Sequence, residues 1–107
     1  MNKDSDKVCE LYSKVNSFLR TNVVEKKTWN KFLKWYNQFG YNVEFKDIAG
    51  KESWDIINTL EDNGFFTYRV QHNIAGANLG DLQDQFNLFC LEKITEWFKA
   101  NVKGFNN

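Results

Sequence analysis

The chain contains no proline, one histidine and two cysteines among its 107 residues. The histidine, His72, has no Cys, Asp or Glu within four residues, which argues against a metal site or a catalytic triad there. Cys9 and Cys90 lie far apart and form no CxxC motif, so we expect a reduced, cytoplasmic setting. No run of about 18 apolar residues occurs and none follows Met1, so we expect neither a membrane-spanning helix nor a secretory signal.

The short motifs that carry common enzyme chemistry are also missing. The sequence has no DxDxDG loop, no HExxH and no Walker-type GxxxxGK followed by Ser or Thr. Carboxylates are numerous, yet their spacing matches no acid/base pair or metal motif. Cys90 lies on an apolar helical stripe, where we expect it to pack as a small hydrophobe. We therefore expect no catalytic residue, cofactor or metal, and the chain is not predicted to be an enzyme.

The composition is that of a folded domain. Hydrophobic residues make up 42%, charged residues 26% and aromatic residues 17%, which is enough to bury a core. The length predicts a single domain over 1–107. The net charge is zero, but residues 1–40 hold eight Lys or Arg against four Asp or Glu, whereas residues 41–107 hold six against ten. Such an asymmetry can steer the approach of a partner.

Apolar residues at helical spacing predict helices over 5–20, 23–39 and 81–103. Asn22, followed three residues later by Glu25, resembles a capping box that starts the second helix, and Gly40 is suited to end it. The third helix carries apolar side chains on an arc of about 200°, namely Leu82, Phe86, Phe89, Cys90, Leu91, Ile94, Trp97 and Phe98. Such a helix is either central to the fold or shares a face with a second copy of the chain, which would make a homodimer.

Two segments alternate between apolar and polar residues, which predicts strands over 41–46 and 66–70. Residues 72–80 are rich in Asn and Gly and predict a loop. The segment 53–63 fits a helix whose apolar arc holds Trp54, Ile56, Ile57 and Leu60, but Asn63-Gly64 could instead turn a hairpin between 55–60 and 65–70. The hairpin would pair poorly matched side chains, so we favour the helix. The predicted fold is α+β, in the order α-α-β-α-β-α, with a small antiparallel sheet beside a long C-terminal core helix.

Residues 45–66 contain a Leu-Glu-x-x-Gly step followed by an apolar pair. The step and the pair consist of Leu60, Glu61, Gly64, Phe65 and Phe66. This order resembles the middle of a winged-helix domain, in which a short helix and a turn lead into a second helix and the apolar pair opens the wing. The resemblance covers residues 45–78, and it implies a first wing strand over 66–70 and a wing tip over 72–78.

The second helix of a winged-helix motif normally offers basic or amide side chains to bases and phosphates. Here the expected exposed side instead carries Glu52, Asp55, Asn58, Thr59 and Asp62. Because carboxylates repel phosphates, this helix is better suited to a protein partner. Any contact with nucleic acid would move to the 23–39 helix and Arg69.

The sequence therefore offers two candidate surfaces. The first is acidic and would bind a protein, with Glu52, Asp55 and Asp62 as contacts and Trp35 as a further candidate. The second is basic, with Lys27, Lys31, Lys34 and Arg69 available to nucleic acid. Small size, absent catalytic groups, many aromatics and uneven charge favour a non-catalytic protein-binding module. We expect a stoichiometric inhibitor of the immunity, antitoxin or phage anti-defence (anti-CRISPR-like) kind, whose partner has a basic nucleic-acid-binding surface. The alternative is a winged-helix-like nucleic-acid-binding regulator.

Overall fold

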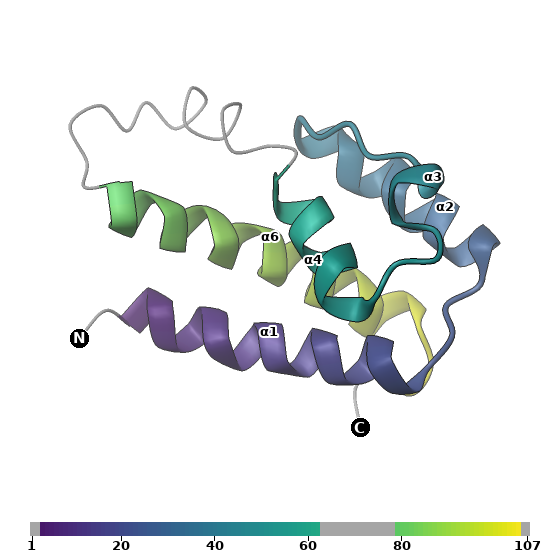
Figure 1. Ribbon diagram of the computed structural model, residues 1–107, viewed down its shortest axis with the longest axis horizontal. Helices are drawn as coiled ribbons and strands as arrows, with labels where there is room; N and C mark the ends of the chain where they lie inside the picture. Colours follow the sequence, from purple (N-terminus) through teal and green to yellow (C-terminus); the bar gives the residue numbers. More distant parts are fainter. Residues whose placement is uncertain (1–2, 63–78, 106–107) are drawn as a thin grey trace.

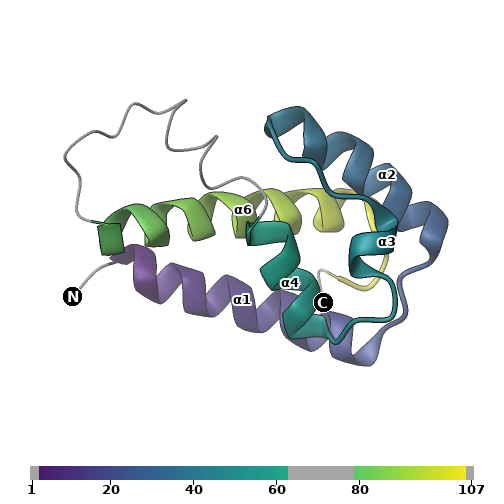
Figure 2. The same ribbon diagram turned by 45° about the horizontal axis from the view of Figure 1, so that its top comes forward.

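The computed structural model describes residues 3–62 and 79–105, and every element of regular structure in them is a helix. The elements in chain order are α1 (Lys3–Thr21), α2 (Lys26–Tyr36), the 3-10 helix η1 (Asn37–Phe39), α3 (Phe45–Ile48), α4 (Ser53–Asp62) and α6 (Leu79–Asn101). The two long helices, α1 and α6, lie side by side and run in the same direction, and α4 lies across this pair (Figure 1). The view in Figure 2 shows α2 and α3 beside α4, towards the C-terminal end of α6.

The predicted helices are found with small changes at their ends. Residues 53–62 form α4, as the helix prediction for 53–63 requires, so the alternative hairpin from 55–60 is excluded. Residues 23–25 are not helical and α2 begins at Lys26, because Asn22 ends the preceding helix instead of capping α2. Both the backbone N–H and the side-chain Nδ2 of Asn22 donate to the carbonyl oxygen of Phe18, at 2.9 and 3.0 Å. Gly40 has a φ of 97°, the left-handed conformation predicted for it.

The predicted α+β fold is wrong, because no strand occurs among residues 3–62 and 79–105. Within the segment expected as the first strand, Tyr41 and Val43 are buried as the alternation requires, but Phe45 already begins α3. The side chain of Asn37 does what a neighbouring strand would do. Its Oδ1 accepts the N–H of Val43 and its Nδ2 donates to the carbonyl oxygen of Val43, both at 3.0 Å. The backbone groups of Val43 are thereby satisfied without a sheet.

Other sequence predictions fall on residues that the structure does not describe. The second expected strand, 66–70, and most of the expected loop, 72–78, lie there, as do Arg69 and His72. The last two residues of that loop, 79–80, belong instead to the first turn of α6.

The core is built around α6. Side chains from its wide apolar arc are buried against all the larger elements of the fold, including Phe86, Cys90, Leu91, Ile94 and Phe98. Phe98 lies edge-on to Trp29 and Phe32 of α2, with ring centroids 5.6 and 5.5 Å apart. Burial within the chain therefore accounts for most of the arc. Phe89 and Trp97 are only half-buried, and a second copy of the chain could cover their exposed parts. A homodimer through this helix therefore stays a prediction.

Within the described ranges, no helix combines the length and the apolar content needed to cross a membrane.

Candidate functional site

The outward side of α4 is the most unusual surface of the described structure. The helix buries Ser53, Ile57, Leu60 and Glu61. Its opposite side, together with Glu52 just before the helix, forms what we call the α4 face: Glu52, Trp54, Asp55, Asn58 and Asp62. At about 100° per residue these positions span an arc of about 160°. All of them are exposed except Asp55, which is half-buried.

Trp54 stands out on the α4 face because its side chain is 52% exposed. The prediction that it belongs to the buried arc of this helix is wrong. Ile57 and Glu61, four residues apart, occupy the inward positions beside it, and Trp54 is left at the edge of the buried side. Within residues 6–62 and 85–105, the only other large apolar side chain classed as exposed is Val23.

The α4 face is acidic. Glu52, Asp55 and Asp62 lie on one side of the helix, as predicted, and none of them forms an ion pair within the part of the chain that the structure describes. A neighbouring cation, Lys51, donates from Nζ to the hydroxyl of Thr59 at 3.2 Å. Trp35, the fourth residue predicted for this surface, is on another helix. It is half-buried on α2 and packs against Phe32 and Phe39, at centroid distances of 6.2 and 5.0 Å.

The basic residues lie on a separate surface. Lys27, Lys31 and Lys34 are all exposed and follow the side of α2 that faces away from its buried residues, and we call this set the α2 face. Lys27 lies 3.9 Å from the carboxylate of Glu25, in a pair whose side chains are both more than two-thirds exposed. Such an exposed pair contributes little to stability, so these lysines are free to meet an anion.

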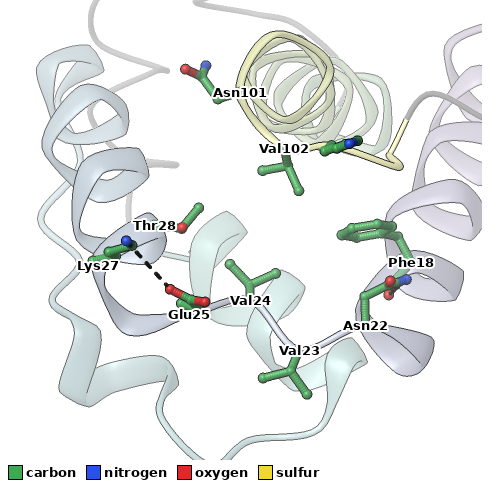
Figure 3. Close-up of a pocket in the computed structure, with 10 residues that line it drawn as sticks. Phe18, Asn22, Val23, Val24, Glu25, Lys27, Thr28, Asn101 and Val102 are labelled. Carbon is green, nitrogen blue, oxygen red and sulfur yellow. Dashed lines mark hydrogen bonds and ion pairs between the residues drawn. The ribbon is translucent and has the colours of Figure 1, made fainter.

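A hollow of about 370 Å³ lies where the α1–α2 connection meets the end of α6 (Figure 3). Its walls are mostly short side chains, including Val23, Val24, Thr28 and Val102. Three charged residues line it: Glu25 and Lys27, which are the pair described above and partly neutralise each other, and Lys103. A ligand site needs several polar groups that converge on one place, and this hollow offers no such set among its described side chains.

Glu61 is the residue that the sequence reasoning missed. It was treated as one of several carboxylates, but its side chain is only 8% exposed. Burial, with the nearby charge of Asp62, raises its pKa to about 7. Its position four residues after the buried Ile57 was the signal that could have placed it inside.

Tyr36, Tyr41 and Cys90 bring hydroxyl and thiol groups into the core. The hydroxyl of Tyr36 donates to the carbonyl oxygen of Leu60 at 2.7 Å, and the hydroxyl of Tyr41 is 3.3 Å from Sγ of Cys90. Burial raises the pKa of Cys90 to about 12, so this thiol is protonated near neutral pH and is not an activated nucleophile. Among the described residues no group of three or more His, Cys, Asp or Glu is placed to hold a metal ion.

Comparisons of the chain with protein-family models, with curated proteins and with solved structures gave no match. The choice between the α4 face and the α2 face therefore rests on their chemistry. The winged-helix resemblance stays a prediction, since the wing that it implies, 66–78, lies outside the described residues.

The two faces differ in what they offer a partner. The α4 face combines a large exposed aromatic ring with hydrogen-bonding groups and negative charge. The α2 face offers positive charge, and Trp35 on the same helix is already packed against Phe32 and Phe39. A half-buried ring that packs in this way presents little of its face for a base to stack on. The α4 face is therefore the better candidate site.

Proposed function

We propose that the protein is a non-catalytic binding module that uses the α4 face to occupy a basic surface of another protein. The observation that carries this proposal is the exposure of Trp54. Tryptophan is the residue type most enriched among the contacts that dominate protein interfaces, since its ring offers a large apolar area and one hydrogen-bond donor. An exposed Trp surrounded by polar and charged groups has the composition of an apolar interface centre with a polar rim.

The charge of the α4 face supports a basic partner. Glu52 and Asp55, three residues apart, are neighbours on one side of the helix, and Asp62 follows on the same side. None of the three has a described ion pair, so Glu52 and Asp55 repel each other in the free protein. A positively charged surface would relieve that repulsion and would also accelerate the encounter. Surfaces that hold nucleic-acid phosphates have this charge. A module bound there would act as a stoichiometric inhibitor, of the immunity, antitoxin or anti-defence kind.

A second candidate function, nucleic-acid binding, is favoured by the α2 face. Lys31 and Lys34 are exposed, and neither forms an ion pair within the described residues. The ammonium groups of Lys31 and Lys34 could bind phosphates, and Lys27 lies on the same face. The zero net charge of the chain argues against this function, because nucleic-acid-binding domains usually carry a broad excess of positive charge.

We expect Trp54→Ala to weaken partner binding by about 30-fold or more, the effect of losing about 2 kcal/mol at an interface centre. The partner would be captured from a nuclease-treated extract of the native host and its affinity measured by biolayer interferometry. The matched control is Val23→Ala, which trims the other exposed apolar side chain and should leave binding unchanged. Both variants should melt close to wild type, because both side chains are exposed. Equal binding by wild type and Trp54→Ala would reject the α4 face as the contact surface.

The carboxylates are tested separately by the triple variant Glu52→Gln, Asp55→Asn and Asp62→Asn. We expect slower association that depends less on salt, since complementary charge acts mainly on the encounter rate. The melting temperature should be unchanged or slightly higher, because repulsion within the helix is removed. The control is Lys27→Gln, Lys31→Gln and Lys34→Gln on the α2 face. If only the lysine variant lost binding, and the bound molecule were a nucleic acid, the second candidate function would replace the first.

A further inference from the structure

The connection between α1 and α2, residues 22–25, carries an apolar side chain that the core does not use. Val23 is 96% exposed, whereas its neighbour Val24 points into the hollow described above, towards Val102 (Figure 3). A second hollow, of about 220 Å³, lies between the connection and the helices α3 and α4, and Val23 and Val24 line it as well. The connection therefore lies between two hollows, and we call residues 22–25 the Val23 ridge.

Half-buried apolar side chains line both hollows. Phe18 and Val102 belong to the first, and Leu19 and Ile56 belong to the second. With Val23 they leave apolar surface in contact with water, and covering such surface is favourable. The backbone N–H group of Val23 has no hydrogen-bond partner among the described residues. A peptide could therefore use apolar contacts and a main-chain hydrogen bond at the same place.

The charge around the Val23 ridge is mostly positive. Among the described residues, three lysines and one carboxylate line the two hollows, namely Lys27, Lys51, Lys103 and Glu25. Glu25 pairs with Lys27, and neither Lys51 nor Lys103 has an ion pair within the described ranges. A further unpaired cation, Lys26, holds its ammonium group 5.5 Å from the ring centre of Phe45, which lines the second hollow. Three uncompensated cations thus surround the apolar walls.

We propose that the Val23 ridge is a second docking surface, which binds an acidic segment of a partner protein. An apolar side chain of that segment enters a hollow beside Val23, and carboxylates on either side of it meet Lys26, Lys51 and Lys103. A protein segment fits better than a nucleic acid, because phosphates gain nothing from apolar walls. The α4 face is acidic and requires the opposite partner charge, so this inference does not depend on the proposed function.

The experiment starts from a display library of random peptides, selected against the full-length protein. We expect one class of selected peptides to contain an apolar residue flanked by Asp or Glu. A fluorescein-labelled member of this class is then titrated with the protein, and fluorescence anisotropy gives its affinity at low and at physiological salt. Absence of the acidic class would overturn the proposal, whether or not the α4 face selects basic peptides.

Two variants locate the bound peptide. Val23→Asp should weaken binding at least about tenfold, because it removes an apolar contact and repels carboxylates. The triple variant Lys26→Gln, Lys51→Gln and Lys103→Gln should do the same at low salt and reduce the salt dependence. Its matched control neutralises three exposed lysines that line neither hollow, with a much smaller effect expected: Lys31→Gln, Lys34→Gln and Lys99→Gln. All these side chains are exposed, so the variants should melt close to wild type.

Three results would overturn the proposal. Equal binding by wild type and Val23→Asp would place the peptide elsewhere, and loss of binding in Trp54→Ala would place it on the α4 face. Displacement of the peptide by a single-stranded oligonucleotide would show that the surface accepts any polyanion. Failure to find a basic protein partner would instead reject the proposed function and leave this result standing.

Discussion

Replacing Phe98 by alanine is expected to lower the free energy of unfolding by about 3 to 5 kcal/mol. Phe98 is completely buried on α6, and its ring contacts aromatic rings from α1, from α2 and from the C-terminal turn. The cavity left by the truncation would be lined by these rings, which cannot all collapse into it. The free energy of unfolding of a domain is roughly 5 to 15 kcal/mol, so a large part of the stability would be lost. Urea unfolding at 25 °C measures the change.

Phe89→Ala is the matched control on the same helix. Phe89 belongs to the same predicted apolar arc, but it is half-buried and lies 6.2 Å from the ring of Phe39, with the ammonium group of Lys93 above it. We expect a cost of about 1 to 2 kcal/mol, since less apolar area leaves water there. Equal costs for the two variants would mean that Phe89 is covered in solution. Light scattering at micromolar concentration would then show whether a second copy covers it.

The long helices could be predicted from the sequence because each contains many apolar residues at the three- and four-residue spacing of a helix. In α6 the arc is so wide that a surface location was excluded, and the structure places it in the core. The ends are less well determined, as Asn22 illustrates. Its side chain can cap the start of one helix or the end of another, and in the structure it donates to the carbonyl oxygen of Phe18 at the end of α1.

The strand prediction failed because alternation reports which side chains are buried, not what the backbone bonds to. Tyr41 and Val43 do enter the core, on alternate residues of an extended segment. The backbone of Val43 needed a partner, and Asn37, six residues earlier, supplied it. Nothing in the sequence pattern distinguishes a side-chain amide in that role from a neighbouring strand.

The candidate site was predicted in part. The three carboxylates of α4 were placed on one side of the helix correctly, because their relative positions follow from helical geometry alone. Trp54 was assigned inside, and the burial of Glu61 was not foreseen. Hydrophobicity favours a buried Trp and an exposed Glu, but the helix is oriented by Ile57, Leu60 and the hydrogen bond between Ser53 and Asn16. This orientation is a tertiary property, and it overrides the preference of the individual residues.

We expect the protein to be more stable at pH 5 than at pH 8, and Glu61 to account for roughly 2 to 3 kcal/mol of the difference. Burial and the charge of Asp62 raise the pKa of Glu61 from 4.5 in the unfolded chain to about 7 in the folded protein. The folded state therefore binds the proton more tightly. The stabilisation is fully present below the unfolded pKa, is lost progressively as the pH rises from 4.5 to 7, and is gone above that.

The contribution of Glu61 is isolated by comparing variants at each pH. Glu61→Gln keeps the shape of the side chain but cannot ionise, so its unfolding free energy should change less between pH 5 and pH 8 than that of wild type, and it should be the more stable protein at pH 8. Glu52→Gln, at an exposed position close in sequence, should follow the wild-type curve. Other titrating groups contribute equally to all three proteins and cancel in the differences. Parallel curves for wild type and Glu61→Gln would show that the carboxyl group reaches solvent or a cation in the folded state, and that its burial imposes no cost on ionisation.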